Sequence, residues 1–225
     1  LPVYQLMLRS SNQYLKNESF IPSLRQYYGN EKGELYALPF NSSSAVLYYN
    51  KTLFDKAGID FIPKTWFDVE KASKILKDKK LSACGFTTSY PSWINFENFT
   101  QWHGVSIIKK TPKNQIEVDY HSKALSFHLN KLASWHKEGI YHYAGRDSNA
   151  TALFTSAKCA MLIQSSGAFN SLKKEGFFKV DVSSLPYWPQ YRKAGFNGLI
   201  GGAALWVIKG FDEQTYEGIT QFLTF

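Results

Sequence analysis

Hydrophobic positions along the chain recur with two different periods, and the change of period predicts helices that alternate with single strands. The clearest helix spans residues 122–137, where leucines recur every three or four residues and a glycine follows the last turn. The same reasoning places further helices at 51–57, 66–79, 93–102, 148–156, 168–174 and from 212 to 225. Strand-like runs lie at 35–38, 46–49, 81–88, 159–164 and 199–207. This succession indicates an α/β layer architecture.

Turn and cap residues set the expected boundaries of these elements. Thr65 followed by Asp68 approximates a capping box at the start of the 66–79 helix, and Gly58 closes the helix before it. A hairpin or loop is expected around 112–115. Residues 1–33 read as short helical pieces and loop, and the two runs at 35–38 and 46–49 read as one connection that changes layer between them.

Composition and charge narrow the function classes. The 225 residues are 44% hydrophobic and 16% aromatic, which is ample for a packed core. A formal net charge of +8 favours anionic partners, but the basic residues are scattered or in short clusters beside polar turns, which is typical of a solvated face. Nucleic-acid binding is therefore not expected. No run reaches the roughly 18 apolar residues of a membrane span.

The cysteines and the first residue leave two questions open. Cys84 and Cys159 have no metal-binding spacing, and they fit either two buried free thiols or one long-range disulfide. The five histidines form no tight cluster, so neither a metal nor a cofactor is expected. The sequence begins at Leu1 without a signal-peptide pattern, which indicates a processed form, an engineered piece or a fragment.

Three stretches of small residues are candidate binding segments. Ser42, Ser43 and Ser44 precede a strand-like run, where they either face a polar ligand or satisfy their own backbone, and the stretch by itself favours the second reading. The run 165–167 (Ser-Ser-Gly) stands at a strand-to-helix junction, which suits either an anion or a simple N-cap. Gly202 follows another glycine inside a strand, which marks either a bulge or a contact between ligand and backbone.

Tryptophans and catalytic motifs complete the inventory. Most of the six tryptophans are expected in the core, while Trp66 at a helix start and Trp93 after a turn lie where loops meet a cleft. The chain has no GxSxG, P-loop or GxGxxG motif and no evident nucleophile with a base. Backbone-rich segments without such a pair predict binding without catalysis, and hence not an enzyme.

Six segments in register carry a family resemblance. They are "LPFNSSSAVLYYNKTLFDKAG", "PKTWFDV", "SWINFENFTQWHG", "YAGRDSNAT", "KCAMLIQSSG" and "IGGAALWVIKG". In order and spacing they resemble the periplasmic solute-binding proteins of sn-glycerol-3-phosphate ABC importers, which are similar to maltose-binding protein. The resemblance runs from about residue 34 to 225.

The resemblance implies a class II periplasmic-binding-protein fold, in which two α/β lobes are joined by crossing strands beside a ligand cleft. It implies a remnant of lobe I with the first crossing at 1–44, lobe II at 45–197, and the return crossing with the start of the C-terminal part of lobe I at 198–225. Lobe II is then nearly complete, and the chain is expected to be truncated at both ends. The family residues that precede and follow this span, a Tyr and an acidic residue on one side and a Tyr and an Arg on the other, are absent.

The resemblance also implies a site and a function. Hydroxyls, bare backbone and aromatic rings are expected to face the ligand, at Ser43, Ser165, Gly202, Trp66, Ser42 and Trp93. The implied ligand is sn-glycerol-3-phosphate or a glycerophosphodiester, captured in the periplasm by a monomer and passed to permease subunits of an ABC importer. The alternative is an oligosaccharide-binding subunit of such an importer. Two departures are Tyr90-Pro91, where relatives have Gly-Trp, and Ala204, where Ser is common.

Overall fold

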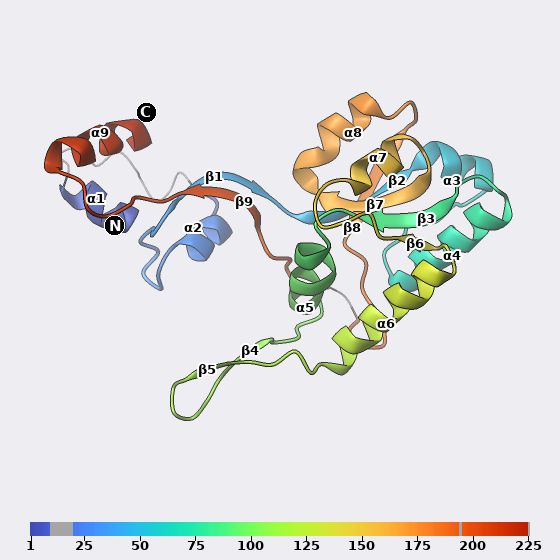
Figure 1. Ribbon diagram of the computed structural model, residues 1–225, viewed down its shortest axis with the longest axis horizontal. Helices are drawn as coiled ribbons and strands as arrows, with labels where there is room; N and C mark the ends of the chain where they lie inside the picture. The colour runs from blue at the N-terminus through green and yellow to red at the C-terminus, as the bar shows by residue number, and fades with distance from the viewer. Residues whose placement is uncertain (10–19, 194, 225) are drawn as a thin grey trace. The chain divides into compact units, whose positions relative to one another are not determined.

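The computed structural model describes residues 1–9, 20–193 and 195–224, which divide into two compact units (Figure 1). Unit 1 comprises Leu1–Ser43 together with Ile200–Phe225, and unit 2 comprises Ser44–Leu199. The chain therefore enters unit 2 after Ser43 and leaves it after Leu199. Residue 225, the predicted end of the last helix, lies outside the described residues.

Unit 2 is built on a five-stranded mixed sheet with the strand order β6-β3-β7-β2-β8. The strands are β2 (Ala45–Asn50), β3 (Cys84–Thr88), β6 (Tyr141–His142), β7 (Cys159–Ser165) and β8 (Val180–Ser184). β3 runs parallel to β6 and β7, whereas β2 runs antiparallel to β7 and β8. Because β3 and β7 are parallel neighbours, their carboxyl ends meet at one edge of the sheet.

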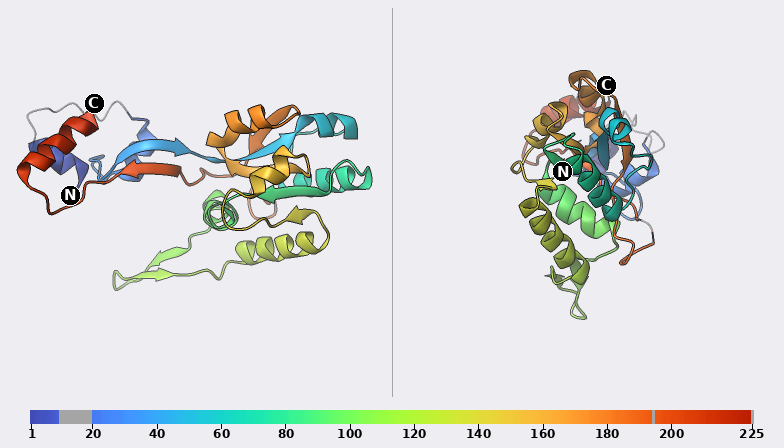
Figure 2. Two further views of the ribbon diagram at one scale, coloured as in Figure 1. Left: turned by 45° about the horizontal axis from the view of Figure 1, so that its top comes forward. Right: turned by 90° about the vertical axis from the view of Figure 1, so that its right-hand side faces the viewer.

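Helices cover both faces of this sheet (Figure 2). On one face, Leu47 and Ile163 pack with α3 (Lys51–Ala57), α4 (Trp66–Asp78) and α6 (Lys123–Lys137). On the other face, Tyr48 and Leu162 pack with α7 (Ala150–Thr155) and α8 (Phe169–Glu175). Neighbouring strand residues thus alternate between two cores, as the pleat requires. The predicted α/β layer architecture is confirmed.

Local capping signals were reliable guides to the helices. The Thr65 hydroxyl accepts from the Asp68 N–H, and the Asp68 carboxylate accepts from the Thr65 N–H, which completes the predicted capping box. Gly58 closes α3 in the left-handed region at φ 67°, and Ser122 caps α6. Leu129 is nevertheless 42% exposed, so the buried face of α6 is wider on the side of His128 and Trp135.

The helix expected at 93–102 has two parts. Residues Trp93–Asn98 form a π-helix, and α5 (Phe99–Trp102) continues it as an α-helix. The Asn98 side chain donates to the Trp93 carbonyl at 3.0 Å, so an amide inserted into the backbone ladder accompanies the wider turn. Short π-helical turns of this kind occur frequently at functional sites.

Two buried cysteines on neighbouring strands form a disulfide. Cys84 and Cys159 are register partners on β3 and β7, with their Cα atoms 4.6 Å apart. The bond joins segments that are 75 residues apart in sequence. Of the two alternatives left open by the sequence, the disulfide is therefore the one observed.

Buried histidines occupy the aromatic core of unit 2. The His128 ring stacks on Phe99 with centroids 4.1 Å apart, and its Nδ1 accepts from Trp188 Nε1 at 3.2 Å. Burial, and to a smaller extent the charge of His103, holds the pKa of His128 well below its ordinary value. The pKa of His103 is also lowered, chiefly by burial. Both rings are thus built into the fold as neutral groups.

Strand prediction was weaker at the sheet edges. The hairpin expected near 112–115 is confirmed as β4 (Ile108–Lys110) and β5 (Ile116–Val118). In contrast, β6 and β8 were not predicted, because β6 has only two residues and β8 carries the polar sequence VDVSS. Each lies at an edge of the five-stranded sheet, where one flank needs no strand partner.

Unit 1 pairs the two distant parts of the chain. β1 (Leu38–Ser43) runs antiparallel to β9 (Gly201–Leu205), and α1 (Val3–Arg9), α2 (Pro22–Tyr28) and α9 (Glu213–Thr224) complete the unit. The expected strand at 35–38 was therefore misplaced, since β1 begins at Leu38 and includes the proline and two serines. Proline is tolerated there because each strand of a two-stranded ribbon is an edge.

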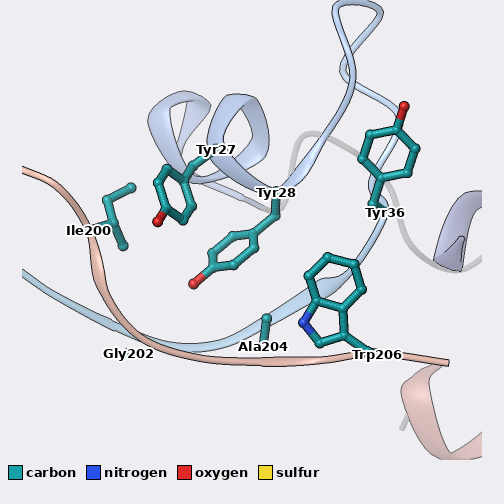
Figure 3. Close-up of a pocket in the computed structure, with 7 residues that line it drawn as sticks. All are labelled: Tyr27, Tyr28, Tyr36, Ile200, Gly202, Ala204 and Trp206. Atoms are coloured by element: carbon teal, nitrogen blue, oxygen red, sulfur yellow. The ribbon is translucent and has the colours of Figure 1, made fainter. Parts of the chain in front are cut away.

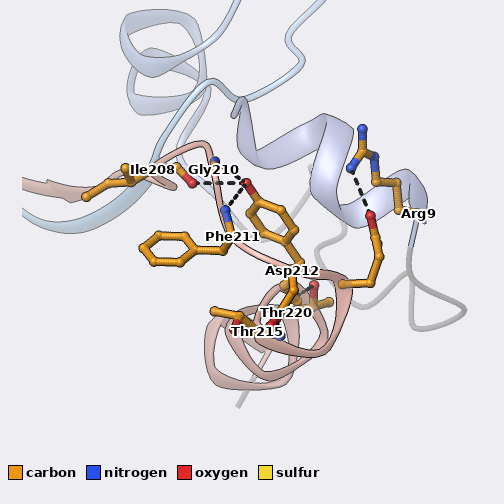
Figure 4. A network of polar contacts seen from close by, with 9 residues as sticks. Arg9, Ile208, Gly210, Phe211, Asp212, Thr215 and Thr220 are labelled. Carbon is orange, nitrogen blue, oxygen red and sulfur yellow. Dashed lines mark hydrogen bonds and ion pairs between the residues drawn. The ribbon is translucent and has the colours of Figure 1, made fainter.

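A tyrosine hydroxyl ties the C-terminal segment of unit 1 together (Figure 4). Tyr216 Oη accepts from the backbone N–H groups of Gly210 and Phe211 at 3.0 and 3.4 Å and donates to the Ile208 carbonyl at 3.4 Å. An ion pair between Arg9 and Glu213 at 3.8 Å joins α1 to α9. Val3 and Leu6 of α1 and Tyr216 and Leu223 of α9 belong to one buried hydrophobic cluster.

Candidate functional site

Ser165 lies at the carboxyl end of β7, where the strand turns into a short helix. Its backbone N–H donates to Gln164 Oε1 at 3.1 Å, and its carbonyl accepts from the Tyr48 hydroxyl at 2.9 Å. Its own hydroxyl oxygen accepts from the Gly167 N–H at 3.2 Å, which is an N-cap. The simple capping reading of this stretch is therefore confirmed, and the hydroxyl proton has no acceptor among the residues that the structure describes.

The start of β2 is fastened to the same turn. The Ser44 N–H donates to Ser166 Oγ at 3.0 Å, and the Ser166 N–H donates to the Ser44 carbonyl at 2.7 Å. Both serines are exposed, while Ser165 is half-buried. This edge of unit 2, formed by Ser44 and residues 165–167, therefore offers hydroxyls and backbone of fixed geometry; we call it the serine edge.

Behind the serine edge lies a buried polar network at the carboxyl end of β3. Gln164 Nε2 donates to Ser89 Oγ and Thr151 Oγ1, each at 3.0 Å. Next to it, Thr88 Oγ1 bonds the Tyr141 hydroxyl at 2.9 Å. Burial raises the pKa of Tyr141, so this phenol stays protonated at neutral pH. The hydrogen-bonding groups of this buried network are therefore uncharged.

Ser42, Ser43 and Gly202 lie on the β1–β9 ribbon of unit 1. Ser42 is the register partner of Gly202, and Ser43 that of Gly201. Because paired residues share a face of a sheet, Ser42 and not Ser43 shares the face of Gly202. Of the two serines, the exposed Ser42 is thus the one placed beside Gly202.

A bulge in β1 lies close to Gly202 of β9. The register shifts between Pro39 and Asn41, so that Phe40 is an extra residue in β1. Gly202 has φ +122°, and a Cβ added there would stand 2.2 Å from the Asn41 carbonyl oxygen. The bulge therefore lies beside Gly202 and not at it, and the positive φ with the close approach to Asn41 is what requires a glycine. A solute contact at its backbone stays a prediction.

An aromatic pocket on unit 1 was not predicted from the sequence (Figure 3). Its volume is about 440 Å³, and it is lined by Tyr27, Tyr28, Tyr36, Ile200, Gly202, Ala204 and Trp206. The rings of Tyr27 and Tyr28 meet edge to face, with centroids 4.9 Å apart. Burial and the neighbouring Tyr27 raise the pKa of Tyr28. Volume and lining fall in the range of small-molecule pockets, and the only local signal was the Tyr-Tyr pair before Gly29.

Trp66 does not lie at a surface. Its side chain is 2% exposed and packs in the aromatic core of unit 2 against Trp188 and His128. A ring buried to this extent has no face left for a solute, so the sequence-based expectation of a ligand contact is corrected here. Trp93 is only partly buried, at the first position of the π-helix, and remains a candidate.

Comparisons with known proteins agree with this architecture. The profile of the family described as "Bacterial extracellular solute-binding protein" matches residues 5–225. The chain belongs to this family.

Among curated relatives, the sn-glycerol-3-phosphate-binding periplasmic protein UgpB of Brucella abortus is 35% identical over 232 residues, covering 100% of this chain and 52% of that protein. Among solved structures, UgpB from Mycobacterium tuberculosis in complex with glycerophosphocholine superposes with a TM-score of 0.77 at 18% identity, covering 100% of this chain and 54% of the other. Maltose-bound MalE3 of T. maritima gives a TM-score of 0.75 at 19% identity, covering 94% and 55%.

These likenesses confirm the predicted periplasmic-binding-protein-like fold and the family resemblance. The chain spans about half the length of the curated relatives it matches. None of the likenesses tests the contacts assigned to Ser42, Ser43, Ser165, Gly202 and Trp93, which stay predictions.

Two further findings concern the described ranges only. They contain no group of three His, Cys, Asp or Glu side chains that could hold a metal ion. No helix within them is both long and apolar enough to cross a membrane.

Proposed function

We propose that this chain is part of an extracytoplasmic solute-binding protein that captures sn-glycerol-3-phosphate or a glycerophosphodiester for an ABC importer. The observation that carries the proposal is the 35% identity to UgpB over the whole chain. The M. tuberculosis UgpB structure contains glycerophosphocholine and has the same fold over the whole of this chain, which supports the same ligand class.

The Cys84–Cys159 disulfide supports a periplasmic location. Disulfides persist in oxidising compartments such as the bacterial periplasm and are rare in the cytosol. This support is independent of the relatives' names, because it comes from the geometry of two strands in this chain. The disulfide and the likeness to periplasmic proteins thus support the same compartment.

The chemistry of the serine edge suits a phosphorylated polyol. Ser165 retains a hydroxyl proton. Next to it, the exposed Ser166 has only a small side chain and the exposed Gly167 has none, so a solute can approach this edge closely. A hydrogen bond from a hydroxyl to an anionic oxygen is stronger than one between neutral groups. The formal charge of +8 adds a long-range attraction for an anionic solute.

We assign unit 2 to lobe II of the family and unit 1 to part of lobe I. Closure of the two lobes over the solute, followed by docking to permease subunits, is the proposed mechanism, and closure is a hinge motion. The protein acts as a monomer that binds without chemistry and without a cofactor. Nucleic acid is not among its partners.

A neutral oligosaccharide is the second candidate solute. It is favoured by the aromatic pocket of unit 1, where Tyr28 and Trp206 offer surface for stacking on a sugar ring, and by the fold shared with maltose-bound MalE3. The two candidates differ in charge, so a direct comparison of ligands separates them.

Calorimetric titration of the intact protein with sn-glycerol-3-phosphate, glycerophosphocholine and maltose tests the proposal. We expect saturable binding of at least one of the two phosphate esters and none of maltose. Saturable binding of maltose alone establishes the second candidate. Release of glycerol-3-phosphate from glycerophosphocholine by the pure protein contradicts the assignment as a non-enzyme.

A further inference from the structure

Two buried side chains hold the main chain of Ser165, one at its N–H and the other at its carbonyl. Gln164 Oε1 accepts its N–H at 3.1 Å, and the Tyr48 hydroxyl donates to its carbonyl at 2.9 Å. Gln164 is 4% exposed and Tyr48 is fully buried. Ser165 itself is half-buried at the serine edge, so two interior residues fix the peptide groups of one accessible residue.

The carboxamide of Gln164 has only one orientation that satisfies its neighbours. The Ser165 N–H can only donate, so the carboxamide oxygen must face it. The nitrogen then faces the hydroxyls of Ser89 and Thr151, each at 3.0 Å. The Ser89 N–H donates in turn to the Ile163 carbonyl at 3.0 Å. One side chain thus couples the ends of β3 and β7 and helix α7 to Ser165.

Tyr48 acts from the same face of the sheet as Gln164, because Gln164 follows Leu162 by two residues, and Tyr48 and Leu162 both pack with α7 and α8. Burial raises the pKa of its phenol to about 12, so the hydroxyl remains a donor over the whole physiological range. Its ring lies parallel to that of Phe169, with centroids 6.4 Å apart, and is fully buried in the α7–α8 core. A group packed in this way cannot follow a moving carbonyl; it restricts the carbonyl to one position.

The hydroxyl of Ser165 keeps one unused function. Its oxygen accepts from the Gly167 N–H at 3.2 Å, and within the described residues it donates to no acceptor. With both adjoining peptide groups fixed, the place to which this proton can be donated depends on the side-chain torsion alone. Such an arrangement is organised before a solute arrives.

We propose that Gln164 and Tyr48 are positioning residues for solute capture, and that they act by fixing Ser165 so that its hydroxyl donates to an oxygen of the phosphorylated polyol. This inference rests on the proposed function. Neither side chain touches the solute. Their contribution to affinity is transmitted through Ser165, and it disappears when the Ser165 hydroxyl is removed.

A double-mutant cycle on the intact protein tests this dependence. Gln164→Met keeps the length of the side chain and removes its hydrogen bonds, and Ser165→Ala removes the hydroxyl. Affinity for sn-glycerol-3-phosphate and glycerophosphocholine is measured by calorimetry, and thermal stability is measured in parallel. Thr87→Val is the matched control, because Thr87 is fully buried on β3 and donates one hydrogen bond, to the His142 carbonyl at 2.7 Å.

We expect Gln164→Met to weaken binding roughly tenfold, as loss of one or two hydrogen bonds does. In the Ser165→Ala background the same change is expected to weaken binding less than twofold, while its effect on stability persists. Tyr48→Phe follows the same pattern, and it keeps the ring that the core needs. Thr87→Val lowers stability without changing affinity.

Three outcomes overturn the inference. Unchanged affinity in Gln164→Met and Tyr48→Phe, with a wild-type protein that binds, shows that both residues are merely structural. A tenfold loss that persists in the Ser165→Ala background shows that they act by another route. A wild-type protein that binds neither phosphate ester refutes the proposed function and, with it, this inference; the wild-type titration alone identifies that case.

Discussion

Removal of the Cys84–Cys159 disulfide is expected to destabilise unit 2 by several kcal/mol. The bond closes a loop of 75 residues, and chain entropy alone gives about 4.5 kcal/mol at 25 °C for a loop of that length. Cys84 is 6% exposed and Cys159 is fully buried, so a Cys84→Ala/Cys159→Ala variant also loses some packing. The expected total is therefore at least about 4 kcal/mol.

Urea unfolding followed by tryptophan fluorescence measures this loss. Trp66, Trp135 and Trp188 are all buried in unit 2, so the signal reports the unit that carries the disulfide. With a urea dependence of about 2 kcal/mol per molar, the midpoint should fall by about 2 M in the variant. The wild-type protein with its disulfide reduced should match the variant.

The reasoning fails if the midpoint moves by less than about 0.5 M, since that corresponds to only about 1 kcal/mol. It also fails if the reduced wild type and the alanine variant differ widely, because the cross-link would then not be the cause. Either result would remove the independent support for an oxidising compartment.

Three further changes should have measurable effects on stability. The pKa of His128 is lower in the folded protein than in the unfolded chain, so the unfolded chain binds the proton first as the pH falls. The free energy of unfolding should therefore decrease by about 1.4 kcal/mol for each pH unit below pH 6.5. In His128→Gln, the urea midpoint of unfolding should depend less steeply on pH. Gly202→Ala should destabilise unit 1 by about 3 kcal/mol, which hydrogen exchange would detect as faster exchange of the amides in β1 and β9. Gly218→Ala in α9 is the matched control: an added Cβ there meets nothing within 4 Å, so this change should stabilise unit 1 slightly. Thr65→Ala should cost about 1 to 2 kcal/mol in urea unfolding through loss of the capping box.

Local chemistry explains which parts of the fold could be predicted from sequence. Thr65 with Asp68, and Gly58, act on their own turn of helix, so their effect does not depend on the rest of the chain. The edge strand β8 was missed because its stability comes from pairing with β2, more than 120 residues earlier in the chain and absent from any local pattern. The disulfide was equally hidden, because only the register of β3 with β7 brings the cysteines together.

The candidate site was predictable in part for the same reason. Ser165 followed from a strand-to-helix junction, a local pattern. The aromatic pocket joins Tyr28 to Trp206 across the β1–β9 pairing, and no window of sequence contains both. Trp66 could have been assigned to the core, because it continues the buried face of α4 marked by Val69 and Leu76.

The most direct test of the account is an NMR titration of the intact, ¹⁵N-labelled protein with sn-glycerol-3-phosphate, with glycerol as the control solute. The predicted result is a saturable shift of the amide signals of Ser165, Ser166 and Gly167 with the phosphate ester and little change with glycerol. Saturable binding that leaves these three signals in place, or equal responses to both solutes, would contradict the claim that the serine edge recognises a phosphorylated polyol.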